Sequence, residues 1–208
     1  PYSQYIFFSK KDNCLIWRIS ALNRQAADEI LLPLFNLPYS IFLRHKQTRL
    51  TTLNKEYIYE NTYENLAQKY LSLPNNPDKQ KIIDFNFITS TAFKSQGKYI
   101  IFPEIHLVLA SLLNRWNAFS QTDFINDKQI TSGLQRYLYV ADYKLNMRPF
   151  SLEGVRVPAF VGTYSIGVVQ NDMAQKILAM LSEFAQLSGI GIKTAIGMGA
   201  VKTQIHSA

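Results

Sequence analysis

The sequence predicts an α+β protein, because apolar residues alternate with period two in some segments and recur with helical spacing in others. In residues 81–89, the apolar Ile83, Phe85 and Phe87 alternate with Asp84 and Asn86, the pattern of a half-buried strand. Residues 104–117 have the spacing of an amphipathic helix. Its apolar positions, at i, i+3, i+4, i+7, i+8 and i+11, are Ile105, Val108, Leu109, Leu112, Leu113 and Trp116.

The second half of the chain has six segments in the order strand, helix, strand, strand, helix, strand. Asp172, with Gln175 three residues later, is typical of the start of the second helix. This order is that of the ferredoxin-like (RRM-like) fold, a four-stranded antiparallel sheet with both helices on one face. The segments are residues 81–89, 104–117, 134–145, 158–169, 171–188 and a final strand that ends near Ile205.

The first half shows the same order with its opening strand and helix missing. An additional short helix is expected over 61–71, with Asn61 and Glu64 as its capping pair, and the polar, Pro-containing residues 73–80 are typical of a linker. We therefore predict two tandem ferredoxin-like domains, an incomplete one at 1–76 and a complete one at 81–208. The segments of the first are a hairpin of residues 3–9 and 14–20 around a turn at 10–13, a helix over 23–35 and a strand over 39–45.

The chain is basic, with 22 Lys and Arg against 15 Asp and Glu and a net charge of +7. Such a balance favours an anionic partner, either nucleic acid or an acidic membrane surface, although a protein that is merely basic fits the charge equally well. The 12 Tyr and 13 Phe are plentiful. Aromatic side chains beside basic ones are what proteins use to bind single-stranded RNA, although most of these aromatics must be core.

The cysteine content and the length of the apolar runs indicate where in the cell the protein is expected. The single cysteine, Cys14, excludes an intramolecular disulfide and a Cys-rich metal site, and we expect it to pack inside the strand over 14–20. No apolar run approaches membrane-spanning length and no signal peptide is visible, so we expect a cytoplasmic protein without membrane association. Because the first residue is Pro1 and not Met, we expect the chain to begin part-way through a longer one or to have been processed.

Four glycines crowd residues 188–202, "SGIGIKTAIGMGAVK". A dinucleotide-binding motif needs its glycines after a strand and before a helix, whereas these follow a helix and precede a strand. A Walker loop needs glycine before its lysine, but Ile192 precedes Lys193. Gly189 is expected as a left-handed C-cap, and turns or a bulge would explain the other glycines structurally. The alternative is that glycine lets main-chain N–H groups approach a polyanion while Lys193 supplies charge.

The stretch 188–201 resembles the C-terminal glycine-rich motif of the CRISPR-associated endoribonucleases that cut precursor CRISPR RNA within its repeats. Residues 160–168, "FVGTYSIGV", and residues 90–117, "STAFKSQGKYIIFPEIHLVLASLLNRWN", are similar to the same family. Residues 1–23 resemble the end of its N-terminal domain. The resemblance covers nearly the whole chain and implies two ferredoxin-like domains side by side, in agreement with the order of segments.

The resemblance implies metal-independent cleavage of a CRISPR repeat transcript. The RNA's own 2′-hydroxyl is the nucleophile, and the products carry a cyclic phosphate and a free 5′-hydroxyl. Such chemistry needs a general base, a general acid and a cation near the developing charge. No cofactor and no metal is implied, and the three His and one Cys of the chain are far apart in sequence. Other CRISPR effector subunits and a second copy of the chain are further partners compatible with the resemblance.

Nine residues are our candidates for RNA binding. Arg115 points off the apolar stripe of its helix, so a surface role fits it as well as RNA contact, whereas Trp116 lies on the stripe and is expected in the core. Lys10 and Lys11, at a hairpin tip, are either solvated or grip the repeat. The nine are Gly189, Gly191, Lys193, Thr194, Gly197, Gly199, Arg44, Lys46 and Arg115.

The catalytic residues are not assigned by the sequence, because the resemblance places the principal catalytic histidine on a helix that precedes Pro1. His45, in the basic patch 44–49, is the in-chain candidate, with a solvated strand end as its other interpretation. His106 is expected at the surface or hydrogen-bonded, and His206 is expected to be frayed. A non-cleaving RNA-binding protein of the same fold is therefore the alternative function. An unrelated ferredoxin-like hydrolase of small molecules is poorly supported, since it would need neither tandem domains nor a basic surplus.

Overall fold

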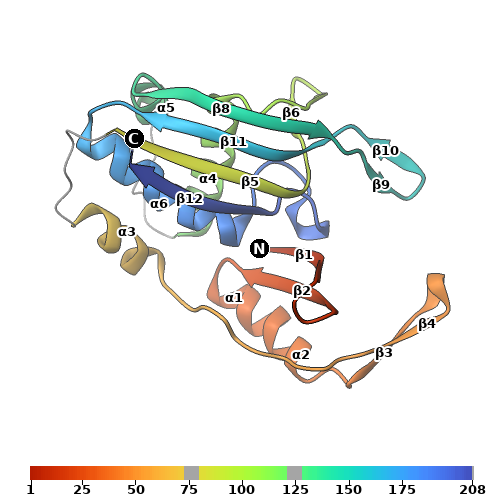
Figure 1. Ribbon diagram of the computed structural model, residues 1–208. Coiled ribbons are helices and arrows are strands. Elements are labelled where there is room, and N and C mark those ends of the chain that lie inside the picture. The colour runs from red at the N-terminus through yellow and green to blue at the C-terminus, as the bar shows by residue number, and fades with distance from the viewer. Residues whose placement is uncertain (73–79, 121–127, 208) are drawn as a thin grey trace.

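The computed structural model of the chain describes residues 1–72, 80–120 and 128–207 (Figure 1). The linker predicted at 73–80 lies almost wholly outside these ranges, so the domain boundary there stays a prediction. The fold class is confirmed: antiparallel sheets with few helices form two ferredoxin-like units, of which the first lacks its opening strand and helix.

The second unit holds a four-stranded antiparallel sheet in the order β12-β5-β11-β8. The first strand of the unit, β5, therefore lies between the fourth and the third, as the ferredoxin-like fold requires. In sequence order the elements are β5 (Lys81–Thr91), β6 (Phe93–Ser95), β7 (Lys98–Ile100), α4 (Ile105–Phe119), α5 (Lys128–Gln135), β8 (Leu138–Met147), β9 (Phe150–Leu152), β10 (Val155–Val157), β11 (Phe160–Val168), α6 (Asp172–Ser188), the 3-10 turn η3 (Thr194–Ile196) and β12 (Val201–Ser207).

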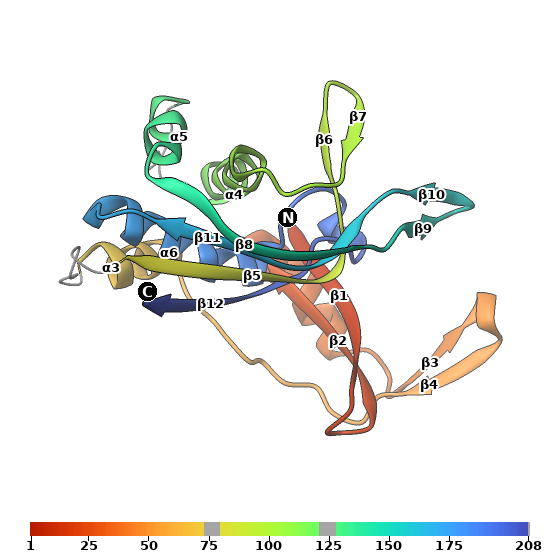
Figure 2. The same ribbon diagram turned by 45° about the horizontal axis from the view of Figure 1, so that its top comes forward.

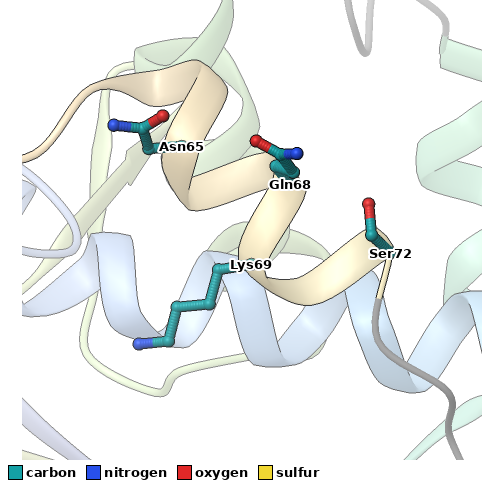
Figure 3. Close-up of a pocket in the computed structure, with 4 residues that line it drawn as sticks. All are labelled: Asn65, Gln68, Lys69 and Ser72. Carbon is teal, nitrogen blue, oxygen red and sulfur yellow. The ribbon is translucent and has the colours of Figure 1, made fainter.

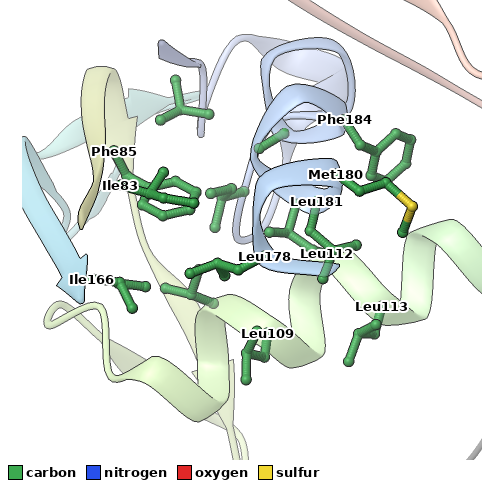
Figure 4. Packing of buried hydrophobic residues seen from close by; sticks show 14 of the residues in the cluster. Ile83, Phe85, Leu109, Leu112, Leu113, Ile166, Leu178, Met180, Leu181 and Phe184 are labelled. Carbon is green, nitrogen blue, oxygen red and sulfur yellow. The ribbon is translucent and has the colours of Figure 1, made fainter. Parts of the chain in front are cut away.

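The main core lies between this sheet and the helices α4 and α6. Ile83 and Phe85 of β5 and Ile166 of β11 face Leu109 of α4 and Leu178 of α6 (Figure 4). All five side chains are fully buried. The period-two prediction for β5 and the apolar stripe of α4 are both confirmed, and the stripe is what binds α4 to the sheet.

Two hairpins that were not predicted interrupt the second unit, β6–β7 and β9–β10. Gln96 and Gly97 turn the first with positive φ at both positions, and Glu153 and Gly154 turn the second in the same way. A two-residue turn with positive φ at both positions suits the twist of a hairpin, and glycine favours it. Figure 2 shows both hairpins projecting from the body of the molecule.

The first unit begins with the predicted hairpin, and its helix is confirmed but contains a wide turn. Leu32 N–H donates to the carbonyl of Ala27 in a π-helical segment that ends directly before Pro33. Proline has no N–H and would crowd the carbonyl of Glu29 in a regular α-helix, which explains the wide turn. The elements are β1 (Tyr2–Ser9), β2 (Cys14–Ala21), α1 (Arg24–Ala26), the π-helix η1 (Ala27–Leu31), α2 (Leu32–Phe35), β3 (Ser40–Leu43), the 3-10 turn η2 (Arg44–Lys46), β4 (Thr48–Thr51) and α3 (Tyr63–Leu71).

The strand predicted over 39–45 differs from the structure in length and in partner. It is β3, which pairs with β4 in a separate two-stranded sheet and not with the β1–β2 hairpin. In the order β12-β5-β11-β8 the fourth strand pairs only with the first. β1 and β2 correspond to β8 and β11, the strands with which the fourth strand does not pair, so β3 is not expected beside them.

Helix α3 packs on the second unit. Its Tyr63 ring meets Trp116 edge-on with centroids 4.9 Å apart, and Leu66 and Ala67 are buried in the main core. Thr62 caps the helix by accepting from Asn65 N at 3.1 Å, so the predicted pair Asn61 and Glu64 is wrong by one residue.

The cap of α6 is also displaced by one residue, but toward the N-terminus. Asn171 accepts from Ala174 N at 2.8 Å, in place of the predicted Asp172 with Gln175. In both helices the cap is the extended residue directly before the first helical residue, and apolar periodicity does not locate that residue.

Candidate functional site

The glycine-rich loop, residues 189–200, joins α6 to β12 and is folded back on itself at the end of β5. Gly189 N–H closes α6 by donating to the carbonyl of Ala185 at 2.9 Å. The two arms of the loop are joined by Ile190 N–H to Gly199 O at 2.8 Å. Ile192 N–H donates to Ala92 O at 3.0 Å, and Gly199 N–H donates to Ser90 O at 3.1 Å, so the loop is tied to the strand beside it.

All four glycines of the loop have positive φ, and three of them are also required by packing. A Cβ would lie 2.1 Å from Ile190 O at position 199, 2.4 Å from Ala92 O at position 191 and 2.9 Å from Gly199 O at position 189. Only the position of Gly197 is open, with no heavy atom within 4 Å. Gly189 ends the helix at φ 67° and ψ 176°, which is not the predicted left-handed cap but an extended conformation essentially restricted to glycine.

Lys193 and Thr194 are neighbours in the loop but differ in exposure to solvent. Lys193 has a left-handed backbone, with φ 58°, and an exposed side chain. Thr194 is only 7% exposed, and its Cγ2 fills the space beside Gly189 and Gly199. Lys193 is therefore available to a ligand, whereas Thr194 packs the inside of the loop.

Arg115 of α4 contacts the main chain where α6 ends and the glycine-rich loop begins. Its Nη1 donates to the carbonyl oxygens of Ser188 at 2.6 Å and Gly189 at 2.9 Å, and its Nη2 donates to Gly191 O at 2.5 Å. Burial lowers the pKa of the guanidinium to about 10, so the group stays charged at neutral pH. Arg115, which was expected at the helix surface, therefore donates to three main-chain carbonyls.

The loop also touches the first unit. Gln4 of β1 donates from Nε2 to Ala195 O at 2.6 Å, and Trp17 of β2 donates from Nε1 to Gln4 Oε1 at 2.7 Å. Ser3 donates to the carbonyl of Leu187 at the end of α6. The loop thus lies where β1 meets the second unit, and sequence reasoning missed Gln4 because nothing in the sequence pairs residue 4 with residue 195.

The basic patch at 44–49 lies elsewhere, at the tip of the β3–β4 hairpin. Arg44 and Lys46 are exposed there, and the side chain of His45 lies outside the described parts of the structure. Figure 2 shows this hairpin projecting from the body of the molecule. The β6–β7 and β9–β10 hairpins carry further exposed cations that were not predicted, Lys94, Lys98 and Arg156, and the exposed Arg148 lies between β8 and β9. The Gln-Gly and Glu-Gly pairs at the hairpin tips are the signal that could have found them.

Two of the histidines pair with carboxylates. His106 Nδ1 lies 3.3 Å from Glu104 Oε2 at the exposed start of α4. His206 Nε2 lies 2.9 Å from Asp84 Oδ2 inside the β12–β5 pairing, so the expectation of a frayed end is wrong. Cys14 is half-buried at the start of β2, less enclosed than expected. Within the described ranges, no three His, Cys, Asp or Glu side chains gather into a possible metal site, and no helix is long and apolar enough to cross a membrane.

A shallow depression on α3 is lined by Asn65, Gln68, Lys69 and Ser72 (Figure 3). None of the residues predicted to bind RNA lines it. Lys69 is ion-paired with Glu183 of α6 at 2.6 Å, so its charge holds α3 on the core. The depression is therefore a weaker candidate site than the glycine-rich loop.

Comparison with known proteins finds relatives that match nearly the whole chain. It is 27% identical over 204 residues to the CRISPR-associated endoribonuclease Cas6 of Mycobacterium tuberculosis (strain CDC 1551 / Oshkosh), covering 98% of this chain and 63% of that protein. It is 26% identical over 205 residues to the Cas6 of Streptococcus thermophilus, covering 98% of this chain and 80% of that protein. The chain thus spans less than two thirds of the Mycobacterium relative.

Solved structures show the same fold. A Cas6 product complex superposes with a TM-score of 0.79 at 22% identity, over 98% of this chain and 82% of that one. Thermus thermophilus Cas6 superposes with a TM-score of 0.69 at 22% identity, over 98% and 79% of the two chains. The sequence profile of the CRISPR-associated endoribonuclease Cas6 family matches residues 85–201. Because that match covers more than half of the chain, the protein belongs to the family of CRISPR-associated endoribonucleases Cas6.

Proposed function

We propose that the protein binds CRISPR repeat RNA and cleaves it into guide RNAs without a metal ion. A ribose 2′-oxygen attacks the adjacent phosphorus, and the bond from phosphorus to the 5′-oxygen breaks. A general base takes the proton of the 2′-hydroxyl, and a general acid supplies a proton to the leaving 5′-oxygen. The products are a 2′,3′-cyclic phosphate and a free 5′-hydroxyl.

The glycine-rich loop at the junction of the two units carries this proposal. Its backbone is fixed by Ile190, Ile192 and Gly199 through main-chain hydrogen bonds, so it enters binding already ordered. A preordered loop loses little entropy when a ligand binds. Its exposed cation, Lys193, can pair with a phosphate, and the open space at Gly197 lets a ribose-phosphate strand approach the backbone.

The exposed cations on the hairpins extend the basic surface. Arg44 and Lys46 on the β3–β4 hairpin, together with the net charge of +7, favour a polyanion longer than a nucleotide. Phosphate contacts of this kind fix the position of the RNA and supply salt-dependent affinity, but they do not read sequence.

Histidine is the side chain best suited to act as acid or base near neutral pH. His106 and His206 each lie beside a carboxylate, at Glu104 and Asp84. These two imidazoles already have partners within the protein. His45 remains the in-chain candidate, and the family resemblance adds a histidine on a helix before Pro1.

Cleavage of repeat RNA in the presence of EDTA tests the proposal. The natural protein that contains this sequence is incubated with labelled repeat RNA at a concentration at which the RNA is bound. One cut within the repeat, with a 5′-hydroxyl on the downstream product, is the expected result. Bound RNA that stays intact, with EDTA and with added Mg²⁺, would instead support a non-cleaving RNA-binding protein. A cut that needs Mg²⁺ would contradict the metal-independent mechanism.

A further inference from the structure

We propose that Arg115 is a positioning residue of the glycine-rich loop. It holds the loop in place through hydrogen bonds to the main chain and adds positive potential to the surface that carries Lys193, without touching RNA. This role rests on the proposed function for its RNA-binding consequence. The ordering of the loop by Arg115 can be measured without RNA.

The geometry of the guanidinium supports a positioning role. Its three hydrogen bonds reach the carbonyls of Ser188, Gly189 and Gly191, which lie within four residues at the end of α6 and the start of the glycine-rich loop. The last carbonyls of a helix have no partner within the helix and form the negative end of its dipole. A planar guanidinium with donors in a fixed fork can satisfy several of them at once, which a lysine ammonium on a flexible stem does less well.

A second side chain from the same helix completes the support. Ser111 lies one turn before Arg115 on α4, and its Oγ accepts from Gly191 N–H at 2.8 Å. Both main-chain groups of Gly191 are thus held by α4, its N–H by Ser111 and its carbonyl by Arg115. The other side of Gly191 is closed by Ala92 O. These three contacts fix the backbone of Gly191 and therefore the position of the next residues, Ile192 and Lys193.

The charge of Arg115 is not cancelled by a carboxylate within the described residues. Each of its recorded hydrogen bonds goes to a carbonyl oxygen, and no ion pair in this part of the chain includes it. A cation in a partly desolvated position acts over a longer distance than one in water, because the local dielectric constant is lower. Arg115 therefore raises the potential felt by a phosphate at Lys193 on the other side of the loop.

Hydrogen–deuterium exchange of the RNA-free protein tests the proposal. In Arg115→Met, the amides of residues 190–199 should exchange about ten- to hundredfold faster, while those of β5 and α6 keep their protection. Arg115→Lys should give an intermediate effect, and it can be measured in place of Arg115→Met if Arg115→Met does not fold. Arg24→Met is the matched control, since the Arg24 side chain is 85% exposed and its ion pair among the described residues is with Asp28, four positions later.

Repeat RNA affinity of the same variants completes the test. Arg115→Met should bind about tenfold more weakly than the natural protein and Arg115→Lys less so, with Arg24→Met unchanged. Unchanged exchange in the loop together with weaker RNA binding would show that Arg115 contacts RNA directly and would overturn the proposal. Faster exchange throughout the molecule in both Arg115 variants would also overturn it, as a general loss of stability. If the natural protein binds no repeat RNA, the proposed function fails, and the exchange of the loop still decides whether Arg115 orders it.

Discussion

Gly191 faces the main-chain carbonyl of Ala92 so closely that a Cβ at position 191 would lie 2.4 Å from the carbonyl oxygen. The contact joins the glycine-rich loop to the chain just after β5, across 99 residues of sequence. Three of the four glycines in the loop are explained by such contacts. The glycine motif therefore fixes the shape of the loop, and its contribution to RNA binding comes through that shape and through Lys193.

Replacement of Gly191 by alanine should destabilise the protein far more than replacement of Gly197. At position 191 both positive φ and the clash with Ala92 oppose a side chain, a cost of about 2–5 kcal/mol. At position 197 only the φ of 101° does, a cost of about 1–2 kcal/mol. Urea unfolding of both variants measures the difference. Equal losses would mean that the packing at Gly191 relaxes freely.

Removal of the charge of Lys193 should flatten the salt dependence of RNA binding. In Lys193→Gln the slope of log K against log salt should fall by about 0.7, one phosphate contact to a single strand. The loss should be similar for repeat RNA and for unrelated RNA of equal length, because a phosphate contact reads no sequence. Arg24→Gln, with the same loss of charge on α1, is the control. An unchanged slope would remove Lys193 from the RNA interface.

Trp116 should matter for stability and not for RNA stacking. Its ring is 1% exposed and packs edge-on against Tyr63 and Phe184. Trp116→Ala should cost about 3–5 kcal/mol of unfolding free energy, and Trp116→Phe should cost much less. Denaturant unfolding gives both values. If Trp116→Phe kept its stability but lost RNA affinity, a direct role in binding would be indicated.

Glu183 should make the attachment of α3 to α6 sensitive to acid. Burial by itself would raise its pKa, but hydrogen bonds from Lys69, Tyr70 and Tyr59 outweigh burial and bring the pKa below its usual value. A carboxyl group with a lowered pKa in the folded state contributes stability above its unfolded pKa, and this contribution is lost as the pH falls through the folded pKa.

Thermal unfolding of Glu183→Gln and the natural protein from neutral to acidic pH tests the role of Glu183. The substitution should cost about 1.5–3 kcal/mol at neutral pH, because it removes charge-assisted hydrogen bonds. The difference should shrink as the pH falls below 4.5, the usual glutamate value. A difference that stays constant with pH would show that the carboxylate charge is not what holds α3.

The sequence predicted the parts of the fold that depend on local pattern. Period two located β5, and the apolar stripe of α4 identified the residues that face the sheet, such as Leu109 and Leu112. It did not predict that β3 leaves the β1–β2 sheet, because the pairing of a strand depends on which neighbours are present and not on its own residues. The caps Thr62 and Asn171 were each missed by one residue, since several polar residues compete there for the same amide.

The candidate site was predicted only in part, for the same reason. Lys193 is exposed as expected, but Arg115 and Thr194 point into the structure. The partners of Arg115 are main-chain carbonyls more than 70 residues away, and Thr194 packs beside Gly189 and Gly199 only once the loop has folded. The sequence pattern shows neither contact. Gln4, which donates to Ala195 O, was missed for that reason.

The most direct test of the account is hydrogen–deuterium exchange of the natural protein with and without bound repeat RNA. The account predicts that RNA slows the exchange of residues 193–198, which surround Lys193 and the open position of Gly197. The amides already bonded inside the loop, such as Ile190 and Ile192, should change little. RNA that is bound or cut while residues 193–198 exchange at their free rate would contradict the claim that this loop contacts the RNA backbone.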